Sequence, residues 1–141
     1  MCVRLDAEAM REISSHESLA PSPKQVGLTI YRRANQEADQ NHWEDALSLY
    51  KFSLEEFVAL LGPRHHVIAR TLNKIGIAYF ALGPQYDYDA FSAFEEALSI
   101  QQDLLSPGDK DTANTLRNIW LMLRRKREEM EYDEMIHIIQ S

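Results

Sequence analysis

The sequence has a single cysteine, Cys2, among 141 residues. One cysteine forms neither an intramolecular disulfide nor a thiolate metal cage, and this usage fits a reducing compartment, so we expect a cytoplasmic protein. Glycine and proline are also scarce, with 5 of each, which excludes a collagen-like or linker-dominated chain. No stretch approaches the roughly 18 consecutive apolar residues of a membrane span, and residues 1–25 are too charged for a secretion signal.

An excess of positive charge is lacking too. Lysine and arginine together number 15 against 22 for aspartate and glutamate, which gives a net charge of −7. This balance argues against non-specific binding to nucleic acid or to an anionic membrane, so we expect protein or peptide partners. Hydrophobic residues make up 45% of the chain, enough for the core of one folded domain.

Apolar residues recur at spacings of three and four from residue 26 onward, which is typical of amphipathic helices. Gly-Pro and Pro-Gly pairs at 62–63, 83–84 and 107–108 interrupt the pattern and predict helix ends there. The predicted helices lie near residues 26–40, 43–61, 67–82, 87–105 and 110–129. Residues 1–25, rich in serine and proline, allow a short helix near 4–14 and otherwise predict a flexible N-terminal segment.

The chain also matches itself. Ala46 and Ala90, and likewise Tyr50 and Phe94, are separated by 44 residues. Ala34 corresponds to Gly76 with an offset of 42, which places two extra residues of the second copy in the loop around 84–88. Helix pairs that repeat in this way usually bury their apolar faces by stacking.

The second copy resembles the tetratricopeptide repeat. The residues that appear in the order of that signature are Gly76, Tyr79, Leu82, Gly83, Ala90, Phe94, Ala97 and Leu98. The small residues suit a close helix crossing, and the aromatic residues fill the space beside it. The first copy departs from the signature at Glu37 and Ser53, and in the third Trp120 takes the position of Gly76, which predicts the end of the stack.

Two further motifs narrow the resemblance. The turn Leu61-Gly62-Pro63-Arg64-His65 and the helix start Thr71-Leu72-Asn73 are similar to those of the long repeats in kinesin light chains. Residues 1–25 contain no sustained heptad seam for pairing with a motor heavy chain.

The resemblance implies an all-α, right-handed superhelical stack of antiparallel helix pairs (an α-solenoid), with about two and a half repeats and a C-terminal capping helix. The expected divisions are an N-terminal segment (1–25), a repeat domain (26–129, with repeats near 27–66, 69–109 and a partial one at 112–129), and a cap or tail (130–141).

The resemblance also implies a non-catalytic scaffold or adaptor that binds a linear peptide in the concave groove formed by the first helix of each pair. The positions carried over to that groove are Leu28, Tyr31, Arg32, Asn35, Arg70, Asn73, Lys74, Ile77, Phe80, Asn114, Arg117, Asn118, Leu121, Arg124 and Arg125. Six of them are basic and none is acidic, so we expect an acidic peptide. The asparagine amides suit contacts to an extended peptide backbone.

Other functions find less support in the sequence. No phosphate loop, nucleophile elbow or zinc-protease motif is present, so we expect no enzyme, no cofactor and no metal site. His65 falls on the family's turn histidine, which predicts a capping role rather than a metal ligand beside His66. An alternative to peptide binding is self-assembly into a homo-oligomer through open ends of the stack and the apolar tail residues Met135, Ile136, Ile138 and Ile139.

Overall fold

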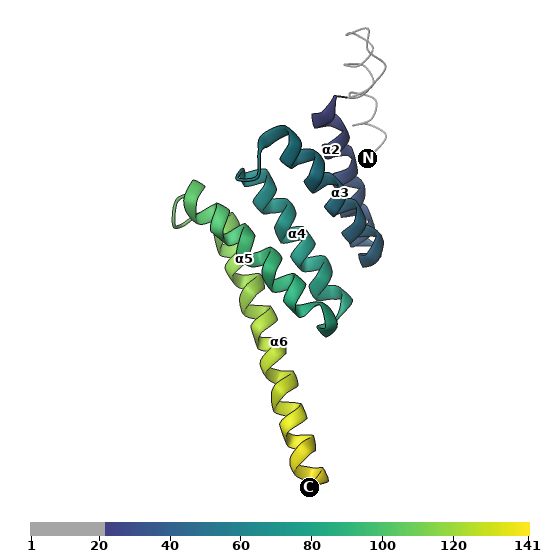
Figure 1. Ribbon diagram of the computed structural model, residues 1–141, viewed down its shortest axis with the longest axis vertical. Helices are drawn as coiled ribbons and strands as arrows, with labels where there is room; N and C mark the ends of the chain where they lie inside the picture. Colours follow the sequence, from purple (N-terminus) through teal and green to yellow (C-terminus); the bar gives the residue numbers. More distant parts are fainter. Residues whose placement is uncertain (1–21) are drawn as a thin grey trace.

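The computed structural model describes residues 22–141, and all of the regular structure in that range is helical. Figure 1 shows the helices in chain order. The elements are α2 (Pro23–Asp39), α3 (Trp43–Leu61), α4 (His66–Leu82), the 3₁₀ turn η1 (Pro84–Tyr86), α5 (Asp87–Leu104) and α6 (Lys110–Gln140). Each helix packs against the next one in sequence, and α4 also touches α6. The prediction of an all-α fold is therefore confirmed.

The predicted N-terminal segment lies almost entirely outside the described residues, as does its short helix near 4–14. Only its end is described, and there the predicted boundary is wrong, because α2 already begins at Pro23. Ser22 caps this helix: its hydroxyl accepts a hydrogen bond from the Gln25 amide, and the Gln25 side chain accepts one from the Ser22 amide. This reciprocal capping box satisfies two amide groups that a helix start otherwise leaves unpaired.

The helix ends follow the predicted signals. α3 stops before Gly62 and α4 stops before Gly83, and both glycines have positive φ angles, of 84° and 128°, which side-chain-bearing residues rarely adopt. His65 caps α4 because its Nδ1 accepts a hydrogen bond of 3.1 Å from the Val67 amide. The capping role predicted for this histidine is confirmed. The two extra residues of the second copy fall in η1, between α4 and α5.

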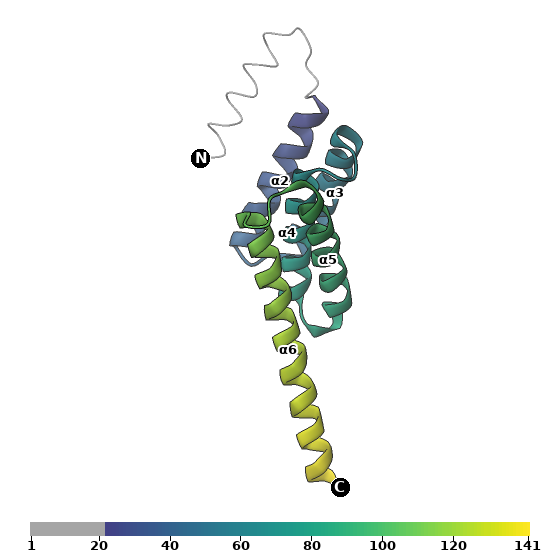
Figure 2. The same cartoon turned by 90° about the vertical axis from the view of Figure 1, so that its left-hand side faces the viewer.

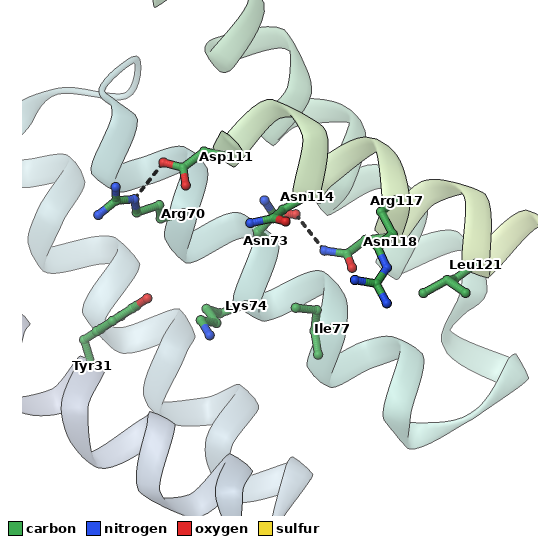
Figure 3. Close-up of a pocket in the computed structure, with 10 residues that line it drawn as sticks. All are labelled: Tyr31, Arg70, Asn73, Lys74, Ile77, Asp111, Asn114, Arg117, Asn118 and Leu121. Atoms are coloured by element: carbon green, nitrogen blue, oxygen red, sulfur yellow. Dashed lines mark hydrogen bonds and ion pairs between the residues drawn. The ribbon is translucent and has the colours of Figure 1, made fainter. Parts of the chain in front are cut away.

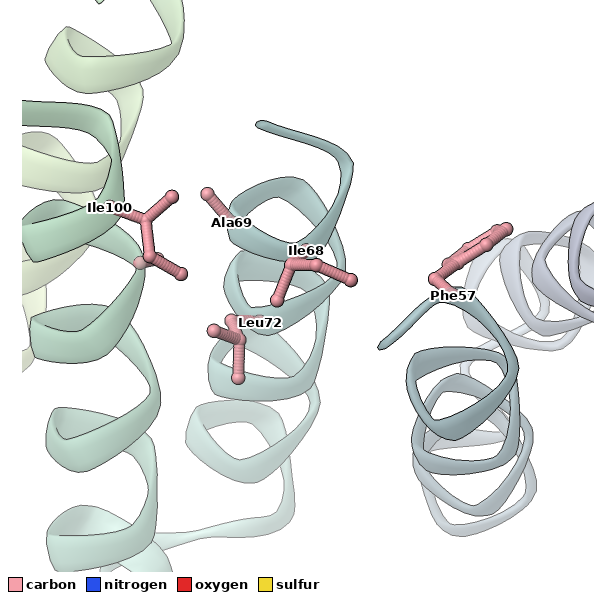
Figure 4. Close-up of a cluster of buried hydrophobic side chains, with 6 residues drawn as sticks. Phe57, Ile68, Ala69, Leu72 and Ile100 are labelled. Carbon is pink, nitrogen blue, oxygen red and sulfur yellow. The ribbon is translucent and has the colours of Figure 1, made fainter. Parts of the chain in front are cut away.

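Large aliphatic side chains and Phe57 form the centre of the core. Figure 4 shows Ile68 and Leu72 of α4 lying between Phe57 of α3 and Ile100 of α5. All four side chains are buried, so this cluster holds three successive helices together. Burial of such side chains contributes about 1.5–3 kcal/mol each.

Small and aromatic residues lie at corresponding positions of the two helix pairs. Ala34 of α2 is fully buried in one cluster with Tyr50 of α3. Gly76 of α4 lies against the ring of Phe94 of α5, and a Cβ atom on this glycine would approach Phe94 Cε1 to 2.5 Å. Two carbon atoms do not pack that closely, so this helix contact requires glycine. The expected packing of a small residue against a large one is confirmed for Gly76 and Phe94.

The last helix is longer than predicted. The sequence placed its end near residue 129, whereas α6 continues to Gln140. Figures 1 and 2 both show its second half extending beyond the other helices. In the segment predicted as a cap or tail (130–141), Met135, Ile138 and Ile139 are exposed. No helix within residues 22–141 combines the length and apolar content that a membrane crossing requires.

Candidate binding groove

A hollow of about 450 Å³ lies among α2, α4 and α6. We call it the groove; Figure 3 shows the side chains around it. Its lining residues are Tyr31, Arg70, Asn73, Lys74, Ile77, Asp111, Asn114, Arg117, Asn118 and Leu121. Nine of these ten positions were predicted from the repeat alignment, and Asp111 was missed. Three helices far apart in sequence thus contribute to one concave surface.

Helical spacing explains how α4 and α6 present these side chains. On α4, Arg70, Asn73, Lys74 and Ile77 follow one another at spacings of three, one and three residues, which keeps them on one side of the helix. On α6, Asn114, Arg117, Asn118 and Leu121 repeat that spacing 44 residues later. The opposite side of α4 carries Ile68, Leu72 and Ile75, which are buried. Core packing on that side turns the polar side of α4 toward the groove.

A chain of hydrogen bonds joins the helices beneath the groove. Asn73 Nδ2 donates to Thr115 Oγ1 at 2.5 Å, and the Thr115 hydroxyl donates to Gln101 Oε1 at 2.6 Å. Asn118 Nδ2 lies 3.4 Å from Asn73 Oδ1. Thr115 and Gln101 are almost completely buried, so their polar groups depend on these bonds. Asn73 therefore ties α4 to α6 as well as lining the groove.

The charges of the groove differ from the sequence expectation in one respect. Arg70 Nε donates to Asp111 Oδ2 at 2.9 Å, and this hydrogen bond raises the pKa of Arg70 above its usual value. A groove without acidic residues was therefore a wrong prediction. Lys74 and Arg117 have no ion-pair partner within residues 22–141. Their positive charges are available to a ligand, and the groove as a whole stays cationic.

Tyr31 forms the α2 wall of the groove. Its ring meets the ring of Tyr50 edge to face, with 5.7 Å between the centroids. Burial is the main cause that raises the pKa of Tyr31 above its usual value. The phenol is therefore uncharged at neutral pH and offers a hydroxyl that can donate or accept a hydrogen bond.

Six predicted groove residues do not line the groove: Leu28, Arg32, Asn35, Phe80, Arg124 and Arg125. Arg125 points to the α4–α5 junction, where Nη1 donates to the Phe80 carbonyl at 2.6 Å and the guanidinium lies 3.6 Å from the Phe80 ring centroid. It also forms an ion pair with Asp87. This arginine is neutralised inside the fold, and the prediction that it faces a ligand is wrong.

The other four lie elsewhere for separate reasons. Leu28 packs against the core cluster around Phe57 and Ile68. Arg124 pairs with Glu128 on the same helix and lies over the Trp120 ring, 5.6 Å from its centroid. Asn35 Oδ1 accepts the hydroxyl of Tyr50 at 2.5 Å, so its amide serves the α2–α3 contact. Arg32 is exposed on α2, away from the hollow. The repeat alignment gave the correct helix for these residues but not their partners.

Asp111 had no signal in the repeat alignment. Its counterpart 44 residues earlier is Val67, an apolar residue, so the repeat assigned it no polar role. The sequence did suggest that Asp111 lies in the first turn of a helix, because acidic residues favour that position, and the structure places it there. Its pairing with Arg70 depends on how the turn after α5 places α6 beside α4, which the sequence pattern does not encode.

Comparison with models of known protein families finds no match, and comparison with curated proteins finds none either. One group of metal-ligand types occurs in the described part of the chain, where Glu37, His42 and Asp45 bring one ligand atom each within 4.8 Å of one another. Glu37 in that group already pairs with Arg33 and with His42. These contacts involve Glu37 and His42, whereas no ion pair within residues 22–141 includes Asp45.

Proposed function

We propose that this chain is a short tetratricopeptide-like repeat domain. The proposal is supported by the 44-residue offset, by the burial of Ala34 and Tyr50 in one cluster, and by the close contact of Gly76 with the Phe94 ring. It is also supported by the order of contacts, in which each helix packs on the next. In such a stack the first helices, α2, α4 and α6, would line one face, and these are the helices that border the groove.

We propose further that the groove binds an acidic linear segment of a partner protein, without catalysis. The observation that carries this proposal is that Lys74 and Arg117, which have no ion-pair partner within residues 22–141, line one hollow together with the amide groups of Asn114 and Asn118. Carboxylates of a ligand would pair with the cations. Amides recognise an extended backbone through its donors and acceptors. The aliphatic side chains of Ile77 and Leu121 provide apolar contact beside them.

The test is selection of peptides by the immobilised full chain from a random peptide library, with the double variant Lys74→Glu and Arg117→Glu as comparison. We expect selected peptides to be enriched in aspartate and glutamate. Reversal of both cations should weaken binding by about a hundredfold or more, because two charge-assisted hydrogen bonds contribute about 1.5–3 kcal/mol each. Binding should also fall as salt is raised, since the groove is open to solvent.

The matched control is the double variant Lys51→Glu and Lys110→Glu, which changes the net charge by the same amount at exposed sites outside the groove. This variant should retain binding, which separates a local effect from a general one. Equal binding by the Lys74/Arg117 variant and the unmodified chain would refute the groove as the site. A library that yields no acidic enrichment on the unmodified chain would refute the class of ligand.

A further inference from the structure

One side of α6 corresponds to the side of α4 that packs on the preceding helix. On α4 the buried residues of this side are Ile68, Thr71, Ile75 and Ala78, and Ile75 shares a cluster with Tyr50 of α3. The residues 44 positions later on α6 are Thr112, Thr115, Ile119 and Met122. Thr115 bonds to Gln101 of α5, and Met122 joins the cluster around Phe94 of α5. α6 therefore lies on α5 with the same side that α4 turns to α3.

A second side of α4 is covered by α5, and its counterpart on α6 is not covered. Figure 4 shows Ala69 and Leu72 on the side of α4 that faces α5, and Gly76 lies against the Phe94 ring. The corresponding residues of α6 are Ala113, Leu116 and Trp120. All three are exposed, and the leucine and the tryptophan have exposures of 50% and 58%. Within the described part of the chain, α6 thus lacks the second helix that α4 has.

The exposed row continues for one further turn of α6. Leu123 is 51% exposed, and a small hollow of about 190 Å³ lies beside it. The residues that line this hollow are Trp120, Leu123, Arg124 and Arg127. We call Leu116 and these four residues the open side of α6. Large apolar side chains exposed together beside charged ones are typical of an interaction surface.

The way in which α5 lies on α4 indicates what fits the open side. Gly76 contacts Phe94, whereas Leu72, one turn earlier on α4, shares a cluster with Ile100, which comes later on α5. The two helices are therefore antiparallel. Trp120 stands at the position of Gly76, so the large residue of this crossing is on α6. A helix that packs closely here needs a small residue where α5 has Phe94.

The basic residues of the open side favour an acidic start of the bound helix. A helix antiparallel to α6 would begin beside residues 124–127, as α5 begins beside the end of α4. Acidic residues are stabilising in the first turn of a helix, and α5 itself has Asp87 and Asp89 there. Arg124 and Arg127 each pair with a glutamate one turn later on α6, and all of these side chains are more than half exposed. Such pairs contribute little to stability, so both arginines can exchange them for carboxylates of a ligand.

We propose that the open side of α6 binds an amphipathic α-helix of a partner protein. The bound helix runs antiparallel to α6, has glycine, alanine or serine opposite Trp120, and carries aspartate or glutamate in its first turn. It takes the place on α6 that α5 has on α4, and it completes a third helix pair. Removal of Leu116, Trp120 and Leu123 from water drives the association. The proposal rests on the repeat correspondence and not on peptide binding in the groove.

The experiment selects helical peptides on the immobilised full chain. The library has the sequence of residues 84–105, with random residues at the positions of Asp87, Asp89 and Phe94. We expect small residues at the Phe94 position and acidic residues at the other two. On a Trp120→Gly variant that circular dichroism shows to be folded, the library should instead yield aromatic residues at the Phe94 position, because this variant restores the arrangement of α4. The same preference on both chains would overturn the proposal, as would a library that yields no binding peptide.

A second variant keeps the test independent of Trp120. Fluorescence anisotropy of a labelled selected peptide should show binding to Leu123→Glu that is about tenfold weaker or more, because an apolar contact is lost and a carboxylate meets the acidic turn of the peptide. Met135→Glu is the matched control, since Met135 is 50% exposed on α6 but outside the open side, and it should retain binding. A peptide that displaced α5 from α4 would not respond to Leu123→Glu, so unchanged binding would overturn the proposal.

Two further measurements separate the open side from other sites. The double variant Lys74→Glu and Arg117→Glu changes the groove, and it should leave the selected helical peptide bound. Loss of this peptide in the double variant would place it in the groove and overturn the proposal. Light scattering on the chain alone should give the 16.3 kDa monomer mass. A dimer that Leu123→Glu converts to monomer would identify a second copy as the occupant and would refute a partner helix.

Discussion

The hydrogen-bonded chain beneath the groove makes a sharp stability prediction for Thr115→Val. This substitution keeps the side-chain shape and removes the hydroxyl. It leaves Asn73 Nδ2 and Gln101 Oε1 without the partner that each has at 2.5–2.6 Å. Both residues are buried, and an unsatisfied buried group costs about 1–3 kcal/mol. The added methyl group returns about 0.8 kcal/mol of apolar burial. We therefore expect a net loss of about 2 kcal/mol in the free energy of unfolding.

A matched control lies one turn earlier on the same helix. Thr112 is also buried, but its Oγ1 has no hydrogen-bond partner within residues 22–141. Thr112→Val should therefore be neutral or stabilising, because it replaces an unsatisfied hydroxyl by a methyl group. Urea unfolding followed by circular dichroism measures both variants, and two-state fits with unchanged slopes allow their midpoints to be compared. If Thr115→Val and Thr112→Val have the same stability, the network does not anchor α6 and the argument is wrong.

Two further predictions concern the helix crossings. Burial raises the pKa of Tyr50 above its usual value. The folded state therefore binds the phenol proton more tightly than the unfolded state does. This difference stabilises the fold below about pH 10, and the stabilisation is lost as pH rises above that value. Tyr50→Phe should therefore reduce the fall in urea midpoint between about pH 9 and about pH 11, and an unchanged fall would contradict the assignment. Gly76→Ala gains about 1 kcal/mol of helix propensity but should lose about 2–3 kcal/mol to overpacking, because its Cβ meets Phe94 at 2.5 Å. Gly76→Ala should lower the midpoint of thermal unfolding, and the decrease should be smaller when the chain also carries Phe94→Leu. An equal decrease with Phe94 and with Leu at that position would exclude the ring as its cause.

Much of the fold was predictable because its helix ends depend on local residues. Gly62 and Gly83 are each followed by a proline, a pair that marks a helix end in a sequence. Both glycines end their helices with a positive φ, which glycine adopts readily. The end of α6 was not predictable in this way. The apolar periodicity weakens among the charges after residue 127, but no glycine or proline follows Gly108. The charged segment is made of good helix formers with ion pairs one turn apart, and the helix continues.

The groove was predictable in outline for a different reason. The repeat maps the exposed side of α4 onto α6, so Asn73 and Lys74 correctly implied Arg117 and Asn118. Ion pairs between helices do not follow from a repeat, because they depend on distances between elements. Asp111 beside Arg70 and Asp87 beside Arg125 are pairs of this kind. Both reduce the positive charge that the sequence alone assigned to the groove.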